Sequence, residues 1–111
     1  MAVVNQYKFV GIDNDTTGNA LNLFGTGVPK INETIIIKSI LVTSASTPTV
    51  TVTNNSITAI KTAALTADTT TELLTQPLIA EGNTTMTVQS SNTGSFDVAI
   101  SYLNILKEKL D

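Results

Sequence analysis

The chain has 111 residues and a formal net charge of −3, with no Cys or His, and its six cationic side chains are all Lys. This composition excludes Ser-His-Asp and Cys-His triads, disulfides and zinc sites of the usual nitrogen and sulfur type. The scattered lysines form no basic stripe, and no apolar run reaches the roughly 18 residues of a membrane span. We therefore expect no enzyme activity, no cofactor, no metal, no nucleic-acid partner and no membrane partner.

The abundant residues favour strands. Thr occurs 20 times, and Ile and Val together occur 20 times, so β-branched side chains fill more than a third of the positions. Such side chains pack well on a pleated sheet and are hindered in helices. In chain order, about eight strands are predicted at 6–12, 19–24, 33–43, 49–53, 57–61, 70–75, 84–90 and 96–106.

The fourth and fifth predicted strands form a hairpin. Val50 and Val52 alternate with threonines, which predicts that the two valines face a core while the threonines face solvent. The Asn54-Asn55-Ser56 cluster that follows is typical of a turn, because these short side chains bond their own backbone.

The third predicted strand carries apolar residues on both faces, so both faces are expected to be at least partly covered. Strict alternation puts Ile36, Ile40 and Val42 on one face and Ile35, Ile37 and Leu41 on the other.

Short strands with frequent turn signals predict an all-β, antiparallel β-sandwich. Eight strands favour a jelly-roll-like topology, although an immunoglobulin-like order fits the same pattern. We predict one domain overall, with a possible N-terminal arm plus first strand at 1–18, the sandwich at 19–106 and a polar tail at 107–111.

No constellation points to chemistry. The run from Asp13 to Gly18 begins like a calcium loop, but Phe24 stands where a bidentate Glu is required, so a turn is favoured. The carboxylates of Asp68 with Glu72, or of Glu81 with Asp97, could form a glycosidase pair only if folding brought them together. The spacing gives no such indication, and solvated carboxylates are the simpler interpretation.

The last predicted strand has apolar residues on both faces, which requires a cover for the second face. Another sheet, a loop or a second subunit could supply it, and an oligomer is the sharper hypothesis. The residues predicted for subunit contacts are Tyr102, Leu103, Ile105 and Leu106, with Val3, Val4 and Tyr7 in a possible arm.

Several segments of the sequence follow one another in a distinctive order. A Leu41-Val42-Thr43 strand end is followed by a Thr/Val hairpin, the turn at Glu81-Gly82-Asn83, a Val88-Gln89-Ser90 strand and a closing Ile100-Ser101-Tyr102-Leu103 strand. Over roughly residues 33–106 this order resembles small virion proteins of tailed bacteriophages.

The resemblance implies a structural role in the virion, as a capsid decoration or cement protein bound in many copies and often trimeric. Implied partners are the major capsid protein or other virion proteins and further copies of the chain. A neck or tail component is the alternative, as is a glycan- or receptor-binding module with polar loops around Asn14, Asn55 and Asn92. The resemblance brings no catalytic residues.

Overall fold

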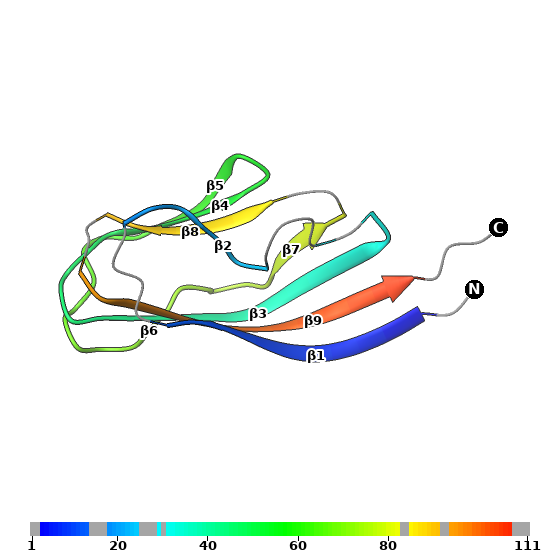
Figure 1. The fold of residues 1–111 in the computed structure, drawn as a ribbon, viewed down its shortest axis with the longest axis horizontal. Coiled ribbons are helices and arrows are strands. Elements are labelled where there is room, and N and C mark those ends of the chain that lie inside the picture. Colours follow the sequence, from blue (N-terminus) through cyan, green and yellow to red (C-terminus); the bar gives the residue numbers. More distant parts are fainter. Residues whose placement is uncertain are drawn as a thin grey trace.

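A computed structural model describes residues 3–13, 18–24, 29, 31–82, 85–91 and 94–107, and these residues form two antiparallel β-sheets packed face to face (Figure 1). The strands are β1 (Val3–Ile12), β2 (Leu21–Asn22), β3 (Glu33–Ser44), β4 (Val50–Asn54), β5 (Ile57–Lys61), β6 (Thr71–Glu72), β7 (Leu78–Glu81), β8 (Met86–Ser90) and β9 (Phe96–Lys107). The predicted all-β sandwich is confirmed.

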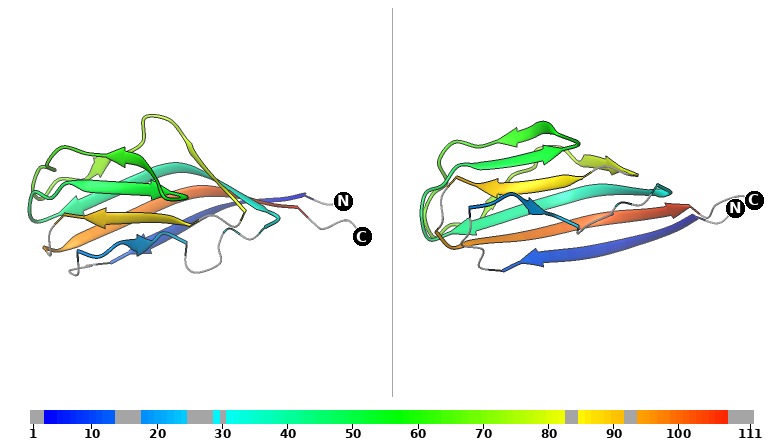
Figure 2. Two further views of the ribbon diagram at one scale, coloured as in Figure 1. Left: turned by 90° about the horizontal axis from the view of Figure 1, so that it is seen from above. Right: turned by 45° about the horizontal axis from the view of Figure 1, so that its top comes forward.

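The strand pairs are nested inside one another. Sheet A has the order β1-β9-β3-β6, with β7 also paired to β3, and sheet B has the order β2-β8-β4-β5 (Figure 2). The β4–β5 hairpin is therefore enclosed by β3 with β6 and β7, then by β2 with β8, and finally by β1 with β9. This nesting is a long hairpin wrapped into a sandwich, which is the jelly-roll topology.

The structure has nine strands among its described residues where eight were expected. The missed strand is β7, which follows Pro77 directly and has only four residues. Both β6 and β7 pair with β3, at Leu41–Val42 and at Thr34–Ile37 respectively, so together they fill one position in the sheet.

A β-bulge in β3 overturns the predicted faces of that strand. The pairing with β9 shifts register between Ile37 and Ser39, so alternation restarts after Lys38. Ile35, Ile37, Ile40 and Val42 are consequently all fully buried on one face. The bulge lies between the β7 and β6 pairings, where Glu72 Oε2 accepts a hydrogen bond of 2.8 Å from the backbone N–H of Ile40.

The core lies between the two sheets. Val50 and Val52 are fully buried, as predicted, and Phe96 is the largest of the fully buried side chains that the structure describes. At the end of the core Phe24 packs edge-on against Tyr102, with ring centroids 4.9 Å apart. The other buried members of this core cluster are Leu23, Ile35, Ile37, Ile40, Val42, Leu65, Ala80, Met86, Val88, Val98 and Ile100.

The molecule is elongated, with extents of 51 × 22 × 21 Å. Its long strands β1, β3 and β9 extend past β4 and β8 toward the end where β1 begins and β9 ends (Figure 1). The first strand, predicted as part of an arm, pairs with β9 at ten positions from Val3–Lys107 to Ile12–Val98. It is thus an edge strand of sheet A.

A candidate interaction surface

Sheet A turns an apolar face away from sheet B. Because side chains alternate along each strand, the partners of buried residues point inward and the residues between them point outward. On this outer face Tyr7 is 81% exposed, Phe9 66% and Ile79 52%. We call it the outer face of sheet A, and it comprises Tyr7, Phe9, Ile36, Leu41, Ile79, Leu103 and Ile105.

One row of this surface crosses four neighbouring strands. Tyr7 of β1 pairs with Leu103 of β9. Leu103 pairs in turn with Ile36 of β3, and Ile36 pairs with Ile79 of β7. Residues directly opposite one another in antiparallel strands have Cβ atoms roughly 5 Å apart, so the four side chains form a continuous apolar stripe.

A shallow hollow of about 440 Å³ lies beside this row, and its lining residues are Tyr7, Lys8, Phe9, Lys38, Ser101 and Tyr102. The Phe9 ring lies against the backbone of Gly11, where a Cβ atom would be 3.3 Å from Phe9 Cε2. Phe9 pairs with the small residue Ser101, and Tyr7 pairs with Leu103.

The fold places the residues predicted for subunit contacts on different sides of sheet A. Tyr7 is exposed, and Leu103 and Ile105 are half-buried on the outer face, where contact with another protein stays a prediction. Tyr102 is only 9% exposed and packs on Phe24, so it belongs to the core of this chain. Leu106 is half-buried on the opposite, inward side, as its pairing with Glu33 requires. The side chains of Val3 and Val4 lie outside the described residues.

Four outer-face residues were not among the predicted contacts: Phe9, Ile36, Leu41 and Ile79. The face of Leu41 was mispredicted because alternation restarts after the bulge in β3. Phe9 has the same spacing as Tyr7 in a strand, so the alternation of β1 could have identified it. Ile36 and Ile79 could not be found in this way, because their direction depends on the bulge in β3 and on the missed strand β7.

The outer face of sheet B is polar. Its outward residues include Thr51 and Thr53 of β4 and Thr87 and Gln89 of β8, which pair across the two strands. The molecule thus presents one apolar and one hydroxyl-rich face.

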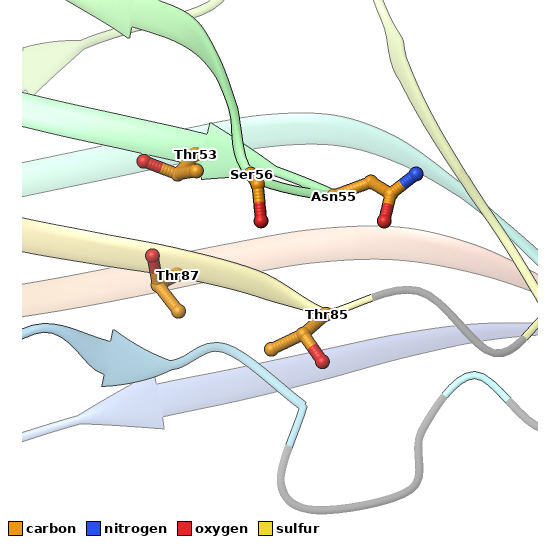
Figure 3. A pocket seen from close by; sticks show the side chains of 5 residues that line it. All are labelled: Thr53, Asn55, Ser56, Thr85 and Thr87. Carbon is orange, nitrogen blue, oxygen red and sulfur yellow. The ribbon is translucent and has the colours of Figure 1, made fainter.

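A polar hollow of about 280 Å³ lies at one end of sheet B (Figure 3), and it is lined by Thr53, Asn55, Ser56, Thr85 and Thr87. Asn55 and Ser56 both have positive φ, of 51° and 66°. The Asn55 N–H donates a hydrogen bond of 2.9 Å to the Thr85 carbonyl, which fixes the turn beside β8. Asn14 and Asn92, the other two predicted loop positions, lie outside the described residues.

The carboxylates have structural partners or stand apart. Glu72 Oε2 accepts hydrogen bonds from the backbone N–H of Ile40 and, at 3.4 Å, from that of Leu74. This carboxylate therefore stabilises the backbone at the bulge in β3. Glu81 pairs with Thr34 and Asp97 with Thr43, nine positions along β3 and therefore roughly 30 Å apart. No cluster of three metal-ligating side chains occurs within the described part of the chain. Those same ranges contain no helix long and apolar enough to span a membrane.

No protein-family model matches the chain, and no curated protein matches it. Among solved structures it is similar to a chain of giant freshwater prawn Macrobrachium rosenbergii extra small virus (XSV) VLP, with a TM-score of 0.52 and 10% identity over 99% of this chain and 82% of that one. A weaker match, with a TM-score of 0.43 and 12% identity, covers 94% of this chain and 32% of a chain of infectious bursal disease virus Gt strain. The first match shows a shared fold.

Proposed function

We propose that this chain is a non-enzymatic structural protein of a tailed-phage virion, which binds the assembled capsid as a decoration or cement protein. The observation that carries the proposal is the apolar row Tyr7–Leu103–Ile36–Ile79 on the outer face of sheet A. Soluble monomers rarely expose a contiguous apolar surface of this kind unless it serves as a contact site.

The sidedness of the molecule favours decoration of a shell. Contact through the outer face of sheet A would bury Tyr7 and Ile79, while the threonines of sheet B would remain in water. A protein that sits on a surface needs this combination, whereas a subunit surrounded on all sides needs apolar contacts in several directions. The fold likeness to a chain of a virus-like particle is a further reason to consider a virion role.

Cementing of this kind requires no reaction. Each contact would add interface between neighbouring capsid subunits, and a contact of about 800 Å² per partner is typical of specific complexes. Several copies of the chain joined to one another would bind several capsid subunits at once, which multiplies modest affinities. The partners in this proposal are the major capsid protein and further copies of the chain.

Quantitative mass spectrometry of purified particles from the source tests the proposal. A copy number near that of the major capsid protein, or a simple fraction of it, is the expected result. Copies in the tens or fewer would instead assign the chain to the neck or tail. Absence from the particles would overturn the virion role.

A second candidate function is glycan or receptor binding, favoured by the hydroxyl and amide groups around the hollow of sheet B. Its lining lacks the aromatic platform on which sugars usually stack. Micromolar binding on a glycan array, lost in a Thr53→Val, Thr87→Val double variant and retained in Ile79→Asp, would support this alternative.

A further inference from the structure

Strand β1 gives sheet A one long edge that no described residue pairs with. Its ten residues pair with β9 without a register shift, which leaves every second backbone N–H and C=O pointing outward on the other side. The other sheet edges are shorter. Sheet B ends in β2 with two residues and β5 with five, and the far side of β3 is divided between β6 with two and β7 with four.

The β1 edge has only one of the devices that normally protect such a strand, a single charged side chain. Native edges are blocked by Pro, by charged side chains or by bulges that twist the edge away. The strand contains no Pro, and its only charged residue is Lys8, which is directed to the inner side of sheet A because it pairs with the buried Tyr102. Tyr7 and Phe9, both mostly exposed, are instead good β-forming residues. This edge therefore has the properties of a strand that receives a partner.

We propose that β1 pairs in antiparallel fashion with β1 of a second copy, about a two-fold axis at Tyr7. The two sheets A then become one continuous sheet, and the two outer faces lie side by side. This inference goes beyond the proposed shell binding, because it concerns the contact between copies of the chain and names its geometry.

The register follows from alternation and charge. Outward residues of one copy must lie opposite outward residues of the other, so the paired residue numbers must add to an even total. A register centred on Lys8 places two lysines directly opposite each other, which is unfavourable. A register centred on Gln6 pairs only positions 3–9 of the described strand. The register centred on Tyr7 pairs positions 3–11, with Lys8 opposite Gln6 and Phe9 opposite Asn5.

The predicted contact is of sufficient size. An antiparallel ladder forms on average one backbone hydrogen bond per residue pair, which gives about nine for this register. A typical stable interface has about ten direct hydrogen bonds. The two Tyr7 rings meet at the axis, where aromatic cross-strand pairs add to the stability of a sheet. A two-fold contact uses the same surface on both copies, and β1 offers such a self-complementary surface.

Mass measurement in solution is the first test. Size-exclusion chromatography with light scattering should give twice the chain mass of 11.7 kDa for the unmodified chain. Tyr7→Lys, which places like charges on the axis, should give a single chain that stays folded by circular dichroism. The matched control is Ile57→Lys, at the exposed edge of sheet B, which should leave the doubled mass unchanged. A single-chain mass for the unmodified protein would overturn the proposal. A threefold mass would also overturn it, in favour of the trimer that the phage resemblance implies.

Disulfide cross-linking tests the register. Because the sequence contains no Cys, only the introduced Cys residues can form the disulfide. In the proposed pair, the two Tyr7 positions are opposite each other, with Cα atoms about 5 Å apart, within the range that a disulfide spans. Tyr7→Cys should therefore form a covalent dimer on mild oxidation. Phe9→Cys should not, because the two Phe9 positions are displaced by four residues, roughly 13 Å along the strands. Cross-linking of Phe9→Cys but not of Tyr7→Cys would overturn this register.

The two proposals can fail separately. Self-association is measured on the isolated chain, whereas shell binding is measured by copy number in particles. A chain that is abundant in particles but single in solution would overturn the β1 pairing alone, and a doubled chain absent from particles would overturn the virion role alone.

Discussion

Asn104 of β9 donates a hydrogen bond of 2.8 Å from Nδ2 to Oε2 of Glu33 on the neighbouring strand β3. Asn104 is buried, and hydrogen bonds to charged groups contribute about 1.5 to 3 kcal/mol. We expect Asn104→Ala to lower the free energy of unfolding by about 2 kcal/mol in urea titrations, because Glu33 loses this donor. Asn22→Ala, at an exposed position of β2, is the control and should change stability by less than about 0.5 kcal/mol. Equal effects would contradict the structural role of the pair.

Tyr102 makes stability sensitive to alkaline pH. Burial, and secondarily the negative charge of Glu33, raises the pKa of Tyr102 above its usual value of 10.0. Because the folded chain favours the neutral phenol, the contribution of Tyr102 is complete below pH 10 and declines as the pH rises through the higher folded value. Urea unfolding from pH 8 to 11 should therefore show a steeper loss above pH 10 for the unmodified chain than for Tyr102→Phe. Parallel curves would show that this group is not responsible.

The bulge in β3 predicts a pattern of stability that strict alternation does not. Ile37 and Ile40 are three positions apart, yet both are fully buried. Truncation of either to Ala should cost about 2 to 5 kcal/mol. Ile36, which directly precedes Ile37 in sequence but is directed outward, should cost about 1 kcal/mol or less as Ile36→Ala. Chemical denaturation of the three variants tests the order, and an Ile36→Ala cost equal to that of Ile37→Ala would contradict the assigned faces.

The second central position of the β4–β5 turn, Ser56, is not occupied by its most favourable residue. Two consecutive positive φ angles at Asn55 and Ser56 are the pattern of a type I′ turn, which favours Gly in its second central position. Ser56→Gly should raise the free energy of unfolding by about 0.5 to 1 kcal/mol, since Gly adopts positive φ without steric cost. In β5 itself, Thr58→Gly should lower it. A loss of stability in Ser56→Gly would show that the turn has another conformation.

The proposed shell binding should depend on the part of the outer face of sheet A that lies away from β1. Ile79→Asp combined with Leu41→Asp places two carboxylates on exposed positions of the outer face. We expect a loss of at least about tenfold in affinity for purified shells, measured by co-sedimentation, because two apolar contacts are replaced by desolvated charges. Thr51→Asp with Thr87→Asp adds the same charge to sheet B and should bind normally. Loss of binding in both double variants would indicate a non-specific charge effect.

The sequence predicted the parts of the fold that local signals determine. The β4–β5 hairpin was identified because the turn residues and the alternation of Val50 and Val52 are contiguous. The bulge in β3 was missed because it is stabilised from a distance, by the Glu72 carboxylate on the Ile40 N–H, 32 positions away. Strand β7 was missed because four residues after a Pro carry too little periodicity.

Only part of the candidate surface was predicted, because the internal face of β9 is also set by contacts between residues far apart in sequence. An apolar run on both faces of β9 indicates that something covers each face, but not which face is internal. The contacts of Tyr102 with Phe24 and of Asn104 with Glu33 decide this, since they turn the even-numbered residues inward. As a consequence, Leu103 and Ile105 point to the outer face, whereas Tyr102 points into the core.

The nested strand pairing has a kinetic consequence. The β4–β5 hairpin joins residues that are close in sequence, whereas β9, at the centre of sheet A between β1 and β3, is the last strand in chain order. A chain leaving the ribosome therefore cannot complete sheet A until Phe96–Lys107 has emerged, and β1 has no partner strand in sheet A while the strands between β1 and β9 are synthesised. Folding of such non-local pairings is slow, typically milliseconds to seconds, and leaves strand edges open to misassociation in the interval. During synthesis in a cell, chaperone access to the nascent β1 should accordingly affect the yield of folded protein.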